Sequence, residues 1–225
     1  MKITKQLVSS LKETTGAGLH ACHKALKAVN GNIEAAIEEL KKAGQKLALS
    51  KVDRATHEGT IIIRVAENAQ KAIMIQVTCE TDFVANNEVF QVFANKLAEQ
   101  AIKNNATTIE ALLKVTMENQ ETIEQARKVV VAKVGENIQI SQLQYLKTAH
   151  RIGSYIHKGR YGALVELKAG NNNIAKEIAI HVVVSQPSDI AALLKQEFYK
   201  DPSQTVVQYL EKQGAEVVQY VLFKM

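Results

Sequence analysis

Residues 58–79 decide the fold, and they read EGTIIIRVAENAQKAIMIQVTC. Apolar side chains recur at every second position, at Ile61, Ile63 and Val65 and again over residues 73–79, on either side of a polar segment at residues 67–70. A period of two places such side chains on one face of an extended chain. The stretch therefore predicts an antiparallel β-hairpin with a turn at residues 67–70.

Helical spacing returns after this hairpin. Residues 90–101 have a helical apolar stripe, and Thr107 with Glu110 three residues later has the pattern of a capping box. A further helix is expected over residues 123–134, ending at Gly135, and residues 137–146, NIQISQLQYL, predict a strand.

The second half of the chain repeats this order in a shorter form. Residues 154–167, SYIHKGRYGALVEL, predict another hairpin, and Ile174 begins a helical stripe. Asp201-Pro202 suits the start of a helix that ends at Gly214, and a last strand follows. We therefore expect an α+β core with two lobes of antiparallel sheets and helices, at residues 56–145 and 146–225.

The first quarter of the chain predicts three short helices instead. The third is expected to begin after Asn32 and to end at Gly44, and residues 41–54, KKAGQKLALSKVDR, read as a basic, solvated connector. Residues 1–55 are thus expected to form a small accessory module with its connector. The expected core stripes of the three helices are Ile3, Leu7 and Leu11, then Leu19, Cys22, Leu26 and Val29, then Ile33, Ala36, Ile37 and Leu40.

Composition and charge narrow the class of protein. The 225 residues are 46% hydrophobic and 23% charged, which is typical of a globular chain. No run of about 18 apolar residues and no secretory leader pattern is seen, so we expect a cytoplasmic protein without membrane contact. The net charge of +5 resides in residues 1–54, which hold ten Lys/Arg and five Asp/Glu. Cys22 and Cys79 lie in apolar patterns and read as packing thiols.

An aromatic residue in a polar segment raises a separate question. Phe83 follows Asp82 in the stretch CETDFVANNEVF, residues 79–90, between a predicted strand and a predicted helix for which Asn86 is a candidate cap. Phe83 has no evident local apolar partner. One interpretation places its ring back on the sheet as a core residue. The other makes it an exposed anchor for a pocket on another protein.

Two other functional classes receive little support from the sequence. A nucleic-acid interface on the second helix lacks clustered arginines, and an enzyme with a cysteine nucleophile lacks a supporting spacing. A metal site from His20, Cys22 and His23 is disfavoured because Cys22 faces the expected core and only the two histidines share a face of the helix. His181, within an apolar stripe, reads as a core histidine.

Five ordered motifs carry a family resemblance. TGAG at residues 15–18, CHKAL at 22–26, TDFVAN at 81–86, VGENI at 134–138 and GSYIHKG at 153–159 together resemble the translation elongation factor Ts family. The resemblance implies a guanine-nucleotide exchange factor, without catalysis or a cofactor of its own. It also implies a ubiquitin-associated-like (UBA-like) three-helix domain before the two-lobed core.

The resemblance also assigns roles to residues. It implies that Thr81, Asp82, Phe83 and Val84 displace Mg²⁺ from the partner GTPase. That partner is elongation factor Tu, bound in its GDP-bound and nucleotide-free forms, with no direct contact to nucleic acid and no metal site in this chain. The implied partner-binding residues are Leu19, His20, His23 and His157.

The sequence departs from the usual family pattern at several of these positions. Family members often have Met, Met, Asp and Lys where this chain has Leu19, His20, Ala21 and His23, and Lys in place of Asn86. The resemblance further implies a short form that lacks a helical coiled-coil insertion and a C-terminal module. We expect fewer accessory contacts with the partner as a result.

Overall fold

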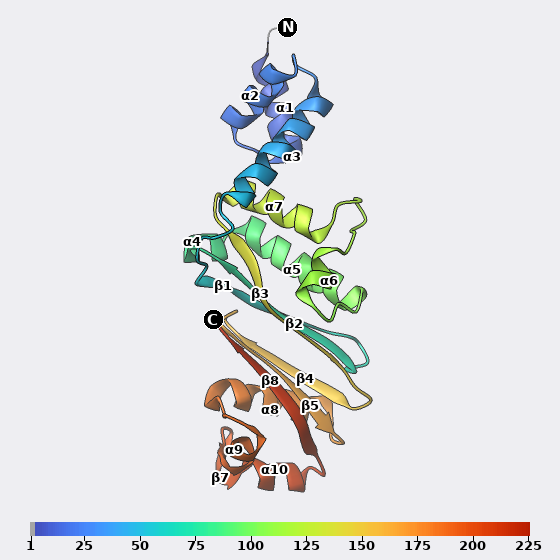
Figure 1. Cartoon of the computed structure of the whole chain (residues 1–225). Helices are drawn as coiled ribbons and strands as arrows, with labels where there is room; N and C mark the ends of the chain where they lie inside the picture. The colour runs from blue at the N-terminus through green and yellow to red at the C-terminus, as the bar shows by residue number, and fades with distance from the viewer. Residues whose placement is uncertain (1–2) are drawn as a thin grey trace.

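The computed structural model describes residues 3–225, in which N-terminal helices precede two three-stranded antiparallel sheets with helices on their outer faces, and a small two-stranded sheet. Figure 1 shows these parts stacked along the molecule, from the N-terminal helices at the top to α10 at the bottom. Within the described residues, no helix is long and apolar enough to cross a bilayer. In chain order the elements are α1 (Lys5–Thr15), α2 (Leu19–Ala28), α3 (Ile33–Leu49), β1 (Glu58–Val65), β2 (Lys71–Cys79), α4 (Asp82–Ala85), α5 (Glu88–Lys103), α6 (Ile109–Leu113), α7 (Ile123–Val134), β3 (Ile138–Lys147), β4 (Arg151–His157), β5 (Tyr161–Lys168), α8 (Asn172–Ser185), α9 (Ile190–Lys195), β6 (Glu197–Phe198), β7 (Asp201–Thr205), α10 (Val206–Lys212) and β8 (Glu216–Lys224).

The first sheet has the strand order β1-β2-β3 and contains the predicted hairpin. β1 and β2 pair antiparallel from Glu58 opposite Cys79 to Val65 opposite Ala72, so the turn at residues 67–70 is confirmed. Helices α5 and α7 cover the outer face of this sheet, as Figure 1 shows. Their shared core includes Ile73, Ile75, Val77, Phe90, Leu97 and Val131.

The second sheet has the order β4-β5-β8, with α8 against its outer face. The inner faces of the two sheets pack on each other, so the first hairpin is buried on both sides. This explains why Ile61, Ile62 and Ile63 are all buried rather than alternating with exposed residues. The prediction of an α+β core with antiparallel sheets is confirmed. The contact between the sheets includes Ile61, Ile63, Met74, Ile152, Leu164 and Phe223.

Helices α1, α2 and α3 enclose a small core of their own, as expected. Thr4 caps α1 by accepting a hydrogen bond from the Leu7 N–H, and Asn32 caps α3. The expectation that Leu19 belongs to the buried stripe is wrong, because its side chain is 55% exposed. Leu19 is the first residue of α2 and lies beyond the cover of the other two helices. The buried members of this core are Val8, Leu11, Cys22, Ala25, Leu26 and Ala36.

The prediction that the third helix ends at Gly44 is also wrong. Helix α3 continues to Leu49, and Gly44 is buried where α3 packs on α7. A glycine is needed there for close approach rather than for a left-handed cap. Residues 41–54 are mostly exposed, as expected, but they are not a separate connector: α3 continues through residue 49, and the Lys51 ammonium donates to the Gly135 carbonyl at the end of α7.

The predicted helix start at Asp201-Pro202 is a strand in the structure. Asp201 begins β7 and pairs with Phe198 of β6, while its carboxylate accepts from the Ser203 N–H at 3.2 Å. This local turn uses the carboxylate that would otherwise cap a helix. Thr205 caps α10 instead, in a capping box with Gln208.

The N-cap of α6 lies one residue later than the sequence predicts. Thr108, not Thr107, precedes this helix, and its hydroxyl accepts from the Ala111 N–H at 3.1 Å. Two adjacent threonines offer the same hydroxyl for capping. The cap is Thr108, whose backbone is extended directly before the first helical residue.

Candidate functional site

The segment between β2 and α5 is a single helical turn, α4, with two inward and two outward residues. Thr81 caps it by accepting from the Val84 N–H at 3.4 Å, and Val84 and Ala85 are buried against the first sheet. Asp82 and Phe83 face solvent, and Phe83 is 84% exposed, the largest value among the exposed large apolar side chains. The interpretation in which Phe83 packs back on the sheet is therefore wrong.

Three polar side chains fix the link from α4 to α5. Asn86 Nδ2 donates to the Asp82 carbonyl at 2.9 Å, and Gln91 Nε2 donates to the Ala85 carbonyl at 2.6 Å. Asn87, rather than the expected Asn86, caps α5. Asn86 instead ends α4, because the four residues 82–85 are themselves helical.

The carboxylate of Glu136 holds the beginning of the turn. Its Oε2 accepts from the Glu80 N–H at 3.1 Å and the Thr81 N–H at 3.0 Å, and its Oε1 accepts the Thr81 hydroxyl at 2.7 Å. Hydrogen bonds to an ionised acceptor are stronger than neutral ones. Glu136 is not among the site residues that the sequence predicts. The quoted motif VGENI was the available signal, but it does not say that Glu136 meets Thr81, 55 residues away in sequence.

The residues beside Glu136 tie the same turn to the segment after α3. Asn137 is fully buried; its backbone N–H donates to Glu80 Oε1 at 2.7 Å, and its Nδ2 donates to the Arg54 carbonyl at 2.8 Å and the Val52 carbonyl at 3.1 Å. The bond from the Asn137 N–H, with a further bond from Arg54, holds the pKa of the Glu80 carboxyl below its ordinary value despite partial burial. Residues 51–54, 80–81 and 135–137 thus form one hydrogen-bonded unit.

Cys79, immediately before the turn, is unsuited to nucleophilic chemistry. It is fully buried, and its Sγ donates to the Thr81 carbonyl at 3.2 Å. Burial raises the pKa of the Cys79 thiol to about 12, and the nearby Glu136 carboxylate adds to the shift. Cys22 is likewise buried in the small N-terminal core, and both cysteines are free, as the packing interpretation predicted.

His157 lies at the same edge of the molecule as the Phe83 turn. It is exposed at the end of β4, and its hairpin tip contacts the start of β1, where Arg160 pairs with Glu58. The Ile61 N–H also donates to the Gly159 carbonyl at 2.8 Å. Because Glu58 pairs with Cys79 at the end of β2, the hairpin tip and the turn adjoin the same strand ends.

The other predicted contact residues lie apart from this edge. Leu19, His20 and His23 are exposed on α2, in the helices at the top of Figure 1, whereas α4 lies beside β1. Cys22 faces the core between them, so it cannot join His20 and His23 around a metal. Across residues 3–225, no group of three His, Cys, Asp or Glu side chains is placed to hold a metal ion.

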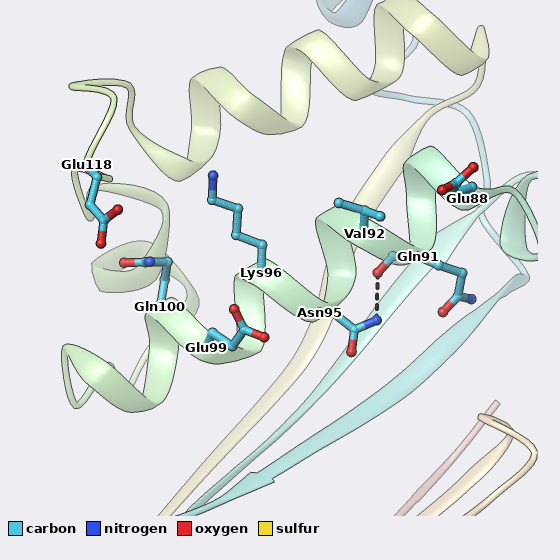
Figure 2. A pocket seen from close by; sticks show the side chains of 8 residues that line it. All are labelled: Glu88, Gln91, Val92, Asn95, Lys96, Glu99, Gln100 and Glu118. Carbon is cyan, nitrogen blue, oxygen red and sulfur yellow. Dashed lines mark hydrogen bonds between the residues drawn. The ribbon is translucent and has the colours of Figure 1, made fainter.

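A shallow groove along the outer side of α5 is unrelated to the predicted residues. Figure 2 shows Val92, Lys96 and Glu99 along the helix and Glu118 from the loop beyond it, with Asn95 donating to the Gln91 carbonyl at 2.8 Å. The groove contains no nucleophile paired with a base. It thus gives no support to an enzymatic site.

Comparisons with known proteins agree on one family. Residues 80–192, which include the Phe83 turn, Glu136 and His157, match the family described as Elongation factor TS. Elongation factor Ts of Legionella pneumophila (strain Paris) is 36% identical over 268 aligned positions, covering 99% of this chain and 92% of the relative. That alignment is longer than the 225 residues of this chain, so the relative has segments that this short form lacks.

Two further relatives have the same name. Elongation factor Ts of Methylococcus capsulatus is 35% identical over 271 positions, covering all of this chain and 92% of the relative. That of Xanthomonas campestris pv. campestris is 43% identical over 192 positions, covering 85% of this chain and 65% of the relative. With motifs, fold and these alignments in agreement, the chain belongs to the elongation factor Ts family.

Proposed function

We propose that this protein is the guanine-nucleotide exchange factor for elongation factor Tu: it binds Tu–GDP, displaces Mg²⁺ and promotes release of GDP during translation elongation. The observation that carries the proposal is Phe83, an aromatic ring that is 84% exposed on a turn anchored at both ends. Large exposed aromatic side chains on rigid supports are typical anchors of protein–protein contacts.

The proposed mechanism requires no chemistry from this chain. A GTPase holds its nucleotide through phosphate contacts and a bridging Mg²⁺. A partner that binds best when those contacts are broken therefore lowers the affinity of the GTPase for its nucleotide. Burial of the Phe83 ring in a pocket of Tu contributes about 1.5–3 kcal/mol to that preference. Asp82, exposed beside the ring, competes for hydrogen-bond donors near the metal, and Thr81 and Val84 hold the turn.

The coupling between factor and nucleotide works in both directions. If the factor lowers the affinity of Tu for GDP tenfold, which is about 1.4 kcal/mol, then GDP lowers the affinity of Tu for the factor tenfold as well. Excess GTP therefore releases the factor and completes the cycle. The factor acts where translation takes place, in the cytoplasm, and needs no membrane, nucleic acid or cofactor.

The remaining contacts are proposed to come from two other places. Leu19, His20 and His23 offer an exposed surface on α2 for the nucleotide domain of Tu, and His157 extends the edge that carries Phe83. We propose that residues 1–55 are a UBA-like module that supplies the first contact, and that residues 56–145 and 146–225 are the two lobes of the core. The compact three-helix cluster around Leu26 supports this division.

Release of a fluorescent GDP analogue from elongation factor Tu, followed by stopped flow, tests the proposal. The unaltered protein should accelerate release, and Phe83→Ala should remove most of the acceleration, about tenfold or more. Because Phe83 is exposed, Phe83→Ala should fold normally. Val184→Ala is the matched control, since Val184 is 61% exposed on α8, which packs on the second sheet rather than on the first. Failure of the unaltered protein to accelerate release would overturn the proposal.

A further inference from the structure

We infer that Glu136 is a positioning residue, whose carboxylate fixes the direction in which Phe83 points. The inference rests on the proposed function, which makes Phe83 the contact with the partner. It assigns a role to Glu136 that acts through the backbone of residues 80–81.

The geometry makes the direction of Phe83 depend on its backbone. The ring is 84% exposed, so packing within this chain does little to hold it. Its backbone belongs to α4, a helix of four residues, and a helix of this length is not stable by itself. The turn must therefore be held from outside, at its two ends and through its buried side chains.

Glu136 supplies the hold at the N-terminal end. It accepts three hydrogen bonds, from the N–H groups of Glu80 and Thr81 and from the Thr81 hydroxyl, at 3.1, 3.0 and 2.7 Å. The same hydroxyl accepts from the Val84 N–H, so one side chain links Glu136 to the cap of α4. Without the carboxylate, two N–H groups and the hydroxyl lose their common acceptor.

Glu136 itself is fixed by its neighbours. Asn137 is fully buried and donates to carbonyls of the segment after α3, and the Lys51 ammonium donates to the Gly135 carbonyl. The three residues 135–137 are thus immobilised between the first sheet and the end of α3. A fixed anchor lowers the ordering cost that an exposed ring pays on binding.

Fluorescence anisotropy measures this role without the partner. The chain contains no tryptophan, so Phe83→Trp places a single indole at the proposed contact. In this background, Glu136→Ala should add a fast, large-amplitude component to the time-resolved anisotropy decay, and Glu136→Gln should give an intermediate result because its amide oxygen still accepts. Far-UV circular dichroism should be unchanged. Glu118→Gln is the matched control, since the Glu118 side chain is 88% exposed at the far end of α5.

Exchange kinetics separate positioning from general stability. At saturating factor, Glu136→Ala in the natural Phe83 background should lower the maximal rate of GDP release by about tenfold, a cost near 1.4 kcal/mol in the exchange barrier. The half-saturating concentration should change less, because the α2 surface and His157 are intact. If the variant only reduced the fraction of folded protein, the concentration of active factor would fall. The apparent half-saturating concentration would then rise, and the maximal rate would stay unchanged.

Two further variants keep the inference testable if Glu136→Ala does not fold. Glu136→Gln keeps one acceptor oxygen and replaces the other with an NH₂ group, so it cannot accept all three bonds. Thr81→Val removes the hydroxyl, which donates to Glu136 and accepts from the Val84 N–H. The inference is overturned if the folded variants leave both the anisotropy decay and the maximal rate as in the unaltered protein. A factor that does not accelerate GDP release at all would count against the proposed function, while the anisotropy result would still decide whether Glu136 holds the turn.

Discussion

Gly44 of α3 lies directly against Ala132 of α7: a Cβ built at position 44 would be 3.1 Å from the Cβ of Ala132. The two helices therefore approach each other with only the Ala132 methyl group between them at this point. The N-terminal helices are joined to the core through a packed helix crossing, followed by the hydrogen-bonded residues 51–54. The surface of α2 is held at a defined place relative to the Phe83 turn.

Gly44→Leu should therefore separate α3 from α7. A leucine at this buried position cannot fit without displacing Ala132, and such overpacking costs about 1–3 kcal/mol of the free energy of unfolding. Urea unfolding measures the loss. Ala43→Leu, one residue earlier on the exposed side of α3, is the control and should change the free energy by less than about 0.5 kcal/mol. Equal stability of the two variants would contradict the crossing.

Much of the fold could be predicted because its signals are local. The period of two over residues 58–79 gave the hairpin, and Gly135, in a left-handed conformation with φ 78°, ends α7 where the sequence indicated. Exposure of Phe83 agrees with the absence of an apolar partner nearby in sequence.

The wrong predictions arose where one local pattern suits two different structures. Gly44 resembles a helix end, and only the presence of Ala132 shows that it serves a crossing. Asp201 resembles a cap, but its carboxylate is used by Ser203. The contact of Glu136 with Glu80 and Thr81 could not be predicted, because a single acidic residue in a loop does not indicate which segment it binds.

Gly153→Ala should destabilise the second sheet. A Cβ at this position of β4 would lie 2.2 Å from the backbone carbonyl oxygen of Ala175 in α8, and backbone atoms cannot move aside cheaply. We expect a loss of at least about 1–3 kcal/mol in the free energy of unfolding, from urea titration. Gly18→Ala is the control, since a Cβ there has no neighbour within 4 Å. A loss no larger for Gly153→Ala than for this control would show that α8 can move away from β4.

The stability of the protein should fall below about pH 6.5 because of His181. This side chain is fully buried; its Nδ1 accepts from the Tyr199 N–H at 3.2 Å, and its Nε2 bonds Gln196 at 3.0 Å. Burial lowers the pKa of His181, and the Gln196 bond offsets this only in part. The unfolded chain therefore binds a proton at a pH where the folded chain does not. The contribution is complete above the unfolded pKa and is lost as the pH falls below it.

Urea unfolding at pH 7.5, 6.5 and 5.5 measures this dependence, with His181→Leu as the comparison. The other five histidines are present in both proteins, so the difference between the two slopes isolates His181. The slope should be steeper in the unaltered protein by up to about 1.4 kcal/mol per pH unit. Identical slopes would mean that His181 is protonated as readily in the folded state as in the unfolded chain.

Leu19→Ala should weaken the complex with elongation factor Tu more than it slows GDP release within it. Leu19 is 55% exposed at the start of α2, and the helix crossing at Gly44 keeps this surface apart from the turn that carries Phe83. Removing an exposed contact side chain should raise the half-saturating concentration of factor several-fold, since about 1 kcal/mol corresponds to roughly fivefold, and leave the maximal rate nearly unchanged. Leu47→Ala is the matched control, a 39% exposed leucine on α3 outside the predicted contact residues. A fall in the maximal rate as large as that of Phe83→Ala would show that α2 takes part in the release step and not only in holding the partner.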